Sequence, residues 1–272
     1  MIFYIIIVFI FGLVVGSFLN VVILRGNRGE SFTRGRSRCE SCGKELAWFE
    51  LIPLLSFALQ RGRCRSCGAA LSRQYPLVEF GTGLFFTFVA IYYSPSGVEG
   101  LPLWSNPRLV FELTFAFVTL SAAIVILVSD IRWQIVPNGP VLILFLAGLV
   151  LTAWRAAVSG SFAYNFAIEF GFAFLVAFFF FALWFLSKGA WMGFGDVKLV
   201  FATSLILGFP VSVAAALFSF WIGAIFGILL LIFKKANLKT HIPFGPFILL
   251  GGVAAFFYTE EFLLYTGFSG LL

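Results

Sequence analysis

Charged residues are scarce in this sequence. They make up 11% of its 272 residues, whereas a soluble domain carries roughly 25%. Hydrophobic residues make up 61%, and the mean hydropathy is +1.04. So little polar surface excludes a water-soluble fold of this length, and the apolar runs are long enough to cross a bilayer as helices.

Eight apolar segments interrupt the few polar stretches. They lie at residues 1–24, 76–94, 108–129, 140–158, 164–187, 197–209, 210–233 and 244–268. The first has no basic residues before its apolar run, so it is interpreted as a retained span and not as a cleaved signal peptide. The expected fold is an all-α polytopic membrane protein of about eight transmembrane helices, the sixth of them short.

Basic residues are unevenly distributed among the connecting segments. Of the 18 Lys and Arg residues, 15 fall in the segments that are cytoplasmic if both termini are periplasmic, namely 25–75, 130–139, 188–196 and 234–243. This orientation satisfies the positive-inside rule, and the opposite one does not. The formal charge of +6 is therefore attributed to topology and to contact with anionic lipid, and no nucleic-acid partner is expected.

Cysteine is limited to four residues, and all of them fall in the polar segment 25–75. They form two Cys-x2-Cys pairs, each followed by glycine: Cys39, Cys42, Cys64 and Cys67. Four thiolates at this spacing favour a closed, structural zinc site, which would stabilise a segment too small for a core of its own. A disulfide pair and a redox dithiol are the alternatives, although disulfides rarely persist in the cytoplasm. The predicted domains are a first helix (1–24), a cytoplasmic four-cysteine domain (25–75) and a membrane domain (76–272).

Aspartate occurs only twice, at Asp130 and Asp196, and each lies at the cytoplasmic end of a predicted span. Ionisable groups at a membrane boundary are candidates for function. Asp196 follows Gly193 and Gly195 in a Gly-x-Gly-Asp sequence, which permits close approach of backbone or substrate. Two neighbouring carboxyl groups share one proton, which is the state that aspartyl proteolysis requires. The alternative is that each Asp merely pairs with a nearby Arg132 or Lys198 in interfacial water.

Six motifs in order resemble those of the bacterial prepilin peptidases, also called leader peptidase/N-methyltransferases. They are Gly16–Val22 (GSFLNVV), the cysteine pairs with Trp48–Pro53 (WFELIP) between them, Tyr75–Glu79 (YPLVE), Asp130 with Ile135–Asn138 (IVPN), Gly193–Leu199 (GFGDVKL) and Ile242–Phe247 (IPFGPF). Asn138 departs from the aspartate that is frequent in the family at that position.

The resemblance implies a membrane aspartyl endopeptidase with Asp130 and Asp196 as catalytic residues. Its substrates would be type IV prepilins or secretion pseudopilins, cut at the cytoplasmic face of the inner membrane. It also implies methylation of the new N-terminus with S-adenosylmethionine, a function associated with the cysteine domain. Gly193, Gly195, Lys198 and Glu79 are the expected supporting or substrate-binding residues.

Two other classes of function remain open from the sequence. Paired membrane carboxylates also relay protons in transporters. Such sites, however, usually lie near the midplane of the membrane and are built on broken helices. A non-catalytic zinc-bearing scaffold for pilus assembly would carry the same cysteines and would tolerate loss of both aspartates.

Overall fold

The computed structural model describes residues 2–93, 107–233 and 241–265, with side chains described as far as Tyr258. Within these ranges the chain is helical, and β-type pairing is limited to two isolated bridges, Arg38 with Glu45 and Arg63 with Ala70. The prediction of an all-α fold is confirmed.

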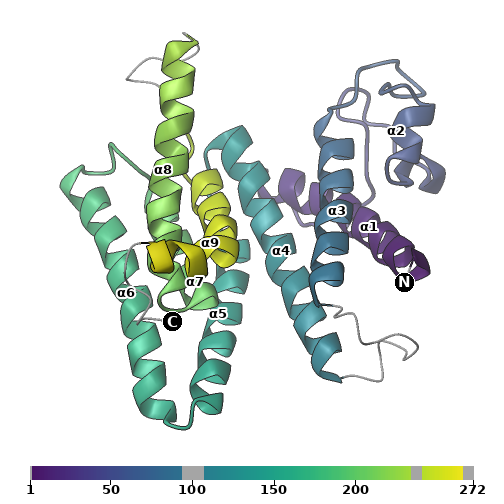
Figure 1. Cartoon of the computed structure of the whole chain (residues 1–272). Coiled ribbons are helices and arrows are strands. Elements are labelled where there is room, and N and C mark those ends of the chain that lie inside the picture. Colours follow the sequence, from purple (N-terminus) through teal and green to yellow (C-terminus); the bar gives the residue numbers. More distant parts are fainter. Residues whose placement is uncertain (1, 94–106, 234–240, 266–272) are drawn as a thin grey trace. The chain divides into compact units, whose positions relative to one another are not determined.

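Helices occupy all eight predicted apolar segments. They are α1 (Ile2–Gly26), α3 (Gln74–Tyr93), α4 (Pro107–Trp133), α5 (Asn138–Val158), α6 (Phe162–Leu186), α7 (Phe194–Leu207), α8 (Val211–Ile232) and α9 (Gly245–Tyr265) (Figure 1). Six of them, α1, α3, α4, α5, α6 and α8, are long and apolar enough to cross a membrane. The sixth segment was predicted to be short, and the 14-residue α7 is too short to span a membrane on its own, although it had been counted among the eight spans.

Two helix ends differ from the prediction, and both differences concern an aspartate. Helix α4 was expected to end at residue 129 but continues to Trp133, so that Asp130 lies within its last turn. The continuation is favoured by Arg132, whose charge suits a helix C-terminus. Helix α7 begins at Phe194, which places Asp196 in its first turn.

The chain forms two compact units, Met1–Val125 and Ile126–Leu272. In the first unit α1 and α3 pack together in opposite directions, since Val8 lies against Phe86 and Ala90 while Gly16 lies against Glu79. A Cβ atom at Gly16 would come within 2.8 Å of the Cα atom of Glu79, so the two helix backbones touch. Small residues commonly permit such contacts in membrane helices.

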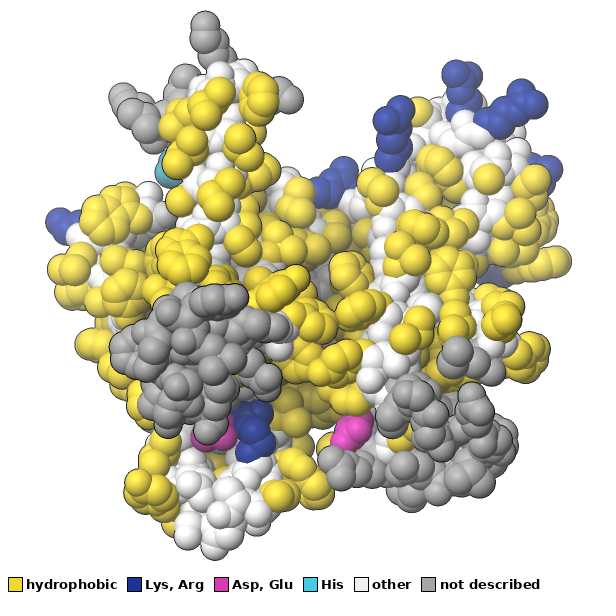
Figure 2. All heavy atoms as spheres, viewed as in Figure 1, with side chains coloured by type: hydrophobic (Ala, Val, Ile, Leu, Met, Phe, Trp, Pro, Cys, Tyr) yellow, Lys and Arg dark blue, Asp and Glu magenta, His cyan; other side chains and the backbone are white. Residues whose placement is uncertain are grey.

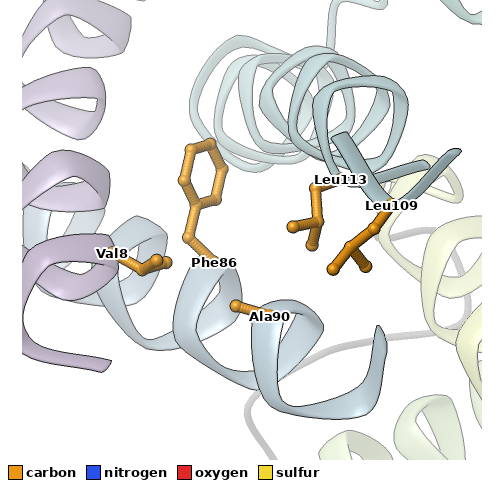
Figure 3. Close-up of a cluster of buried hydrophobic side chains, with 5 residues drawn as sticks. All are labelled: Val8, Phe86, Ala90, Leu109 and Leu113. Atoms are coloured by element: carbon orange, nitrogen blue, oxygen red, sulfur yellow. The ribbon is translucent and has the colours of Figure 1, made fainter. Parts of the chain in front are cut away.

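A buried apolar cluster completes the membrane part of this unit. It joins α1, α3 and the start of α4 and consists of Val8, Phe86, Ala90, Leu109 and Leu113 (Figure 3). The polar segment between α1 and α3 holds the 3-10 helix η1 (Trp48–Leu51) and the short α2 (Leu55–Leu59).

In the second unit α7 is the central element, in contact with α5, α6, α8 and α9 (Figure 1). Seven of its 14 residues are buried, Asp196 among them. By contrast, apolar side chains cover much of the helices that Figure 2 shows, as a surface facing lipid requires. Lys and Arg side chains gather over the segment between α1 and α3 in the same view. The short helix α7, which carries the buried carboxyl group of Asp196, is thus surrounded by longer apolar helices.

Candidate active site

Asp196 is held by the start of its own helix. Its side chain is only 6% exposed, and its Oδ2 atom accepts a hydrogen bond of 3.1 Å from the backbone N–H of Gly193. This contact is one of the two hydrogen bonds of a helix capping box. In it, the acidic side chain at the third helical position accepts the N–H group of the residue that caps the helix, here Gly193. The carboxyl group is therefore oriented by a contact within the local sequence, between residues three positions apart.

Asp130 is oriented by a contact that is distant in sequence. Its side chain is 4% exposed, and its Oδ2 atom accepts a hydrogen bond of 2.9 Å from the backbone N–H of Gly245 at the start of α9. A Cβ atom at position 245 would lie 2.6 Å from this oxygen, so only glycine fits there. Gly245 is part of the Ile242–Phe247 motif, and nothing else in the sequence singles it out.

The two carboxyl groups lie in the same unit and interact electrostatically. Each is buried, and each retains an oxygen atom that the backbone N–H contacts do not use. Buried carboxyl groups in mutual interaction cannot both ionise without a large cost, so such a pair holds one proton between them. The arrangement can both take up a proton and donate one.

The two glycines of the Gly-x-Gly-Asp sequence have different surroundings. A Cβ atom at Gly195 would lie 2.8 Å from the Cβ atom of Val136, in the connection between α4 and α5. A Cβ atom at Gly193 would meet nothing closer than 3.7 Å. Close approach is thus required at Gly195, where it brings the start of α7 against the segment that follows Asp130.

We expect Gly195→Ala to impair any activity of the aspartate pair much more than Gly193→Ala. The added methyl group at position 195 must displace Val136, and overpacking of this kind costs about 1–3 kcal/mol. Thermal unfolding in detergent and substrate turnover would be measured on both variants. Equal behaviour of the two alanine variants would contradict the assignment.

Lys198 is directed to a neighbour other than the aspartates. Its Nζ atom donates a hydrogen bond to Oδ1 of Asn138, which joins α7 to the start of α5, and it lies 5.7 Å from the centre of the Phe194 ring. Asn138 therefore supplies a neutral acceptor at the position where the sequence departs from the family pattern. Lys198 supports the site by linking the two helices.

Arg155 and Glu169 form a site at the other end of α7 that sequence reasoning did not identify. The Arg155 guanidinium binds Glu169 through Nε (2.9 Å) and Nη2 (2.6 Å). It also donates to the carbonyl groups of Leu205 and Ile206. These carbonyls belong to the last turn of α7, whose groups have no partners within the helix. The ion pair thereby caps the helix that carries Asp196.

Arg155→Ala should lower the free energy of unfolding by about 2–3 kcal/mol, less than for a fully buried pair because the Arg155 side chain is 31% exposed. The variant leaves the Glu169 charge unpaired and the α7 carbonyls uncapped. Arg155→Lys retains the charge but not the forked geometry and should recover only part of the loss. Thermal unfolding in detergent measures both, and an unchanged midpoint for Arg155→Ala would show that the contacts are dispensable.

Glu79 belongs to the first unit and is 7% exposed. Its Oε2 atom accepts a hydrogen bond of 2.9 Å from the backbone N–H of Leu54, and its carboxyl group also bonds Ser17. It therefore ties the polar segment to α1 and α3.

The four cysteines converge as their spacing predicted. The sulfur atoms of Cys39, Cys42, Cys64 and Cys67 all lie within 4.8 Å of one another, and none forms a disulfide. A tetrahedral zinc ion with Zn–S bonds of about 2.3 Å places its sulfurs about 3.8 Å apart, and the Cys39–Cys67 separation is 3.9 Å. The donor set fits zinc.

The two cysteine pairs adopt the same backbone turn. Cys39 donates its N–H to Lys44 and accepts one from Gly43, and Cys64 does the same with Ala69 and Gly68. Both glycines have a φ of +71°, which explains the glycine after each pair. The N–H groups of Cys67 and Ser66 also lower the pKa of the Cys64 thiol to about 6, whereas burial and the other three thiols raise the pKa of Cys67 to about 11.

Comparison with known proteins covers both units. The family model for the bacterial peptidase A24 N-terminal domain matches residues 10–93, which include the four cysteines, and the model for the type IV leader peptidase family matches residues 117–228, which include both aspartates. No solved structure matches the chain.

Several curated relatives carry one name, prepilin leader peptidase/N-methyltransferase. The protein of Bacillus subtilis (strain 168) is 32% identical over 264 residues, which span 94% of this chain and 95% of that protein. The protein of Stutzerimonas stutzeri is 30% identical over 275 residues, or 93% and 90% of the two chains. That of Myxococcus xanthus (strain DK1622) is 36% identical over 230 residues, or 82% and 62%.

Proposed function

Since the chain belongs to the prepilin leader peptidase/N-methyltransferase family, we propose that it removes the leader from prepilins or pseudopilins and methylates the new N-terminal amine. The observation that carries the peptidase half is the buried pair Asp130 and Asp196, each fixed by a backbone N–H group in one compact unit. The relatives are named as enzymes, which favours this function over a transporter or a passive scaffold.

The chemistry follows from the shared proton. The ionised aspartate takes a proton from a water molecule as that water attacks the scissile carbonyl carbon. The protonated aspartate donates its proton to the carbonyl oxygen. The aspartate that took the water proton then passes it to the nitrogen of the scissile bond, a hydroxyl proton of the tetrahedral intermediate returns to the other aspartate, and the carbon–nitrogen bond breaks to release the amine. Gly193 and Gly245 keep each carboxyl group oriented through this exchange.

The position of the site in the membrane is part of the proposal. The distribution of Lys and Arg supports a multi-pass inner-membrane protein with periplasmic termini and with both aspartates at the cytoplasmic face. Asp196 opens α7 and Asp130 lies in the last turn of α4, so two helix ends at that face would admit water from the cytoplasm.

The polar segment 25–75 supplies the rest of the proposal. Its four cysteines would hold a structural zinc ion through Cys39, Cys42, Cys64 and Cys67. S-adenosylmethionine would supply the methyl group for the second activity, as the relatives' name implies.

The whole function is tested by reconstituting the chain in lipid vesicles with a prepilin and S-adenosylmethionine. Mass spectrometry should show loss of the leader and then one added methyl group on the new N-terminus. A prepilin that keeps its leader would overturn the proposal and would favour the transporter or the scaffold function.

A further inference from the structure

The Trp48–Pro53 motif turns its acidic residue inward and its aromatic residues outward. Glu50 is 6% exposed, and its carboxyl group lies 3.6 Å from the Nζ atom of Lys44. Trp48 and Phe49, by contrast, are 77% and 42% exposed. Large aromatic side chains that gather on a surface mark a site of interaction. The aromatic half of this motif therefore presents a surface that the described part of the chain does not cover.

The short helix α2 packs against η1 and extends this surface. Leu55 and Leu59 are 52% and 75% exposed, and four positions apart they lie on one face of the helix. Phe57 lies on the opposite side and lines a cavity of about 780 Å³ where the segment meets α1 and α3, a cavity that neither leucine lines. We call the exposed set the apolar face, and its members are Trp48, Phe49, Leu55 and Leu59.

A hydrogen bond fixes the depth of α2 relative to the membrane helices. The backbone N–H of Leu54, the residue before α2, donates to Oε2 of Glu79 at 2.9 Å. Glu79 lies five positions after Gln74, the first residue of a candidate membrane span, or about 7.5 Å along the helix axis. Leu77 and Phe80 beside it are 69% and 47% exposed, as lipid-facing side chains are. Helix α2 thus begins beside the second turn of α3 (Figure 1), at the boundary between headgroups and acyl chains.

Three exposed arginines follow α2 directly, and we call Arg61, Arg63 and Arg65 the arginine cluster. Among the residues that the structure describes, none of them lies within ion-pair distance of a carboxylate. Arg65 lies over the Phe49 ring of the apolar face, 5.4 Å from its centre. The cations nearer the first cysteine pair differ in this respect, since four of them lie close to glutamates: Arg28, Arg36, Arg38 and Lys44. Uncompensated positive charge thus adjoins the apolar face.

We propose that η1 and α2 form an interfacial anchor, in which the apolar face enters the boundary between headgroups and acyl chains and the arginine cluster binds anionic headgroups. Tryptophan favours this boundary because its ring is amphipathic. An apolar face lying in the membrane plane enters about 5–10 Å, which agrees with the depth that the Leu54 hydrogen bond sets. The anchor holds the four-cysteine segment on the membrane. It depends on neither the orientation of the chain nor its enzymatic activities.

Photo-crosslinking in the full-length protein tests which partner covers the apolar face. A p-benzoylphenylalanine is introduced at position 48 or 59, and the protein is placed with prepilin in nanodiscs of phosphatidylcholine and phosphatidylglycerol. Mass spectrometry should find lipid adducts at both positions. Position 41 is the matched control, because Ser41 is exposed in the same segment but has the polar neighbours Glu40 and Lys44. It should give at least roughly tenfold fewer lipid adducts.

Trypsin tests the arginine cluster. Cleavage after these arginines should be at least roughly tenfold slower in nanodiscs that contain phosphatidylglycerol than in phosphatidylcholine alone, because bound headgroups cover them. Cleavage after Arg38, which is paired with Glu45, should change much less and serves as the internal control. The double variant Trp48→Ser/Leu59→Ser should lose this protection. Both side chains are exposed, so the variant should remain folded.

Each alternative has its own result. Crosslinks from positions 48 and 59 to prepilin or to a second copy of the chain, without lipid adducts, would overturn the assignment to lipid. Lipid adducts at position 41 as abundant as those at 48 and 59 would overturn the orientation of the apolar face. Equal rates of trypsin cleavage in the two kinds of nanodisc would overturn the role of the arginine cluster.

Discussion

Asp130→Asn and Asp196→Asn should each abolish removal of the prepilin leader. Asparagine keeps the shape of the side chain and an oxygen atom that can accept the N–H of Gly245 or Gly193. It cannot take up or release the proton that hydrolysis requires. Loss of general acid–base catalysis costs about 10²–10⁴-fold for one group, and because the two carboxyl groups act as one unit, the double variant should be no slower than either single one.

The same variants should not lose stability. Two buried carboxyl groups that interact unfavourably destabilise the folded state, so an asparagine at either position should leave the unfolding midpoint unchanged or raise it. Initial cleavage rates in lipid vesicles and thermal unfolding in detergent would be measured on the same preparations. Loss of activity at retained stability identifies catalytic residues and separates them from residues that merely maintain the fold.

A matched control removes a carboxylate elsewhere. Glu45→Gln changes an exposed side chain that pairs with Arg36 and Arg38, and it should cleave normally because surface ion pairs contribute little. If either aspartate variant cleaves prepilin at a rate close to that of the unaltered protein, the two residues are anchors at the membrane boundary and the peptidase mechanism is wrong.

Cys64→Ser should release the zinc ion and unfold much of the segment between α1 and α3. This segment has only η1, α2 and two isolated bridges, and Cys64 and Cys39 are among its few buried side chains. Binding of structural zinc supplies about 10–16 kcal/mol of apparent free energy in small zinc domains. Without the fourth thiolate the segment has no comparable source of stability.

Zinc content per chain and limited proteolysis measure the effect. The unaltered protein should hold one zinc ion and resist cleavage between residues 25 and 75, whereas Cys64→Ser should do neither. Ser41→Ala, which lies between two ligands but donates no sulfur, should keep the metal. An unaltered protein that contains no zinc and carries oxidised cysteines would instead support the disulfide or redox alternative.

The sequence by itself determined the elements of the fold, because the properties that specify them are local. Apolar runs of sufficient length must become helices in a bilayer, since their backbone groups find no other hydrogen-bond partners there. Two Cys-x2-Cys turns, each closed by a glycine, likewise form from neighbouring residues, and their sulfur atoms come together in the structure as predicted. The two aspartates were identified because the chain contains no others.

Tertiary structure alone decided how these elements are used, because the deciding contacts join residues that are far apart in the chain. Gly245 orients Asp130 from 115 residues away, and Arg155 reaches the end of α7 across 50 residues to Leu205. Glu79 was expected to support the site or bind substrate, but the sequence did not predict that it accepts the N–H group of Leu54, 25 residues away. Hydrogen bonds and cavities of this kind depend on which helix faces pack together, and apolar helices with many equivalent faces do not reveal that choice in their sequence.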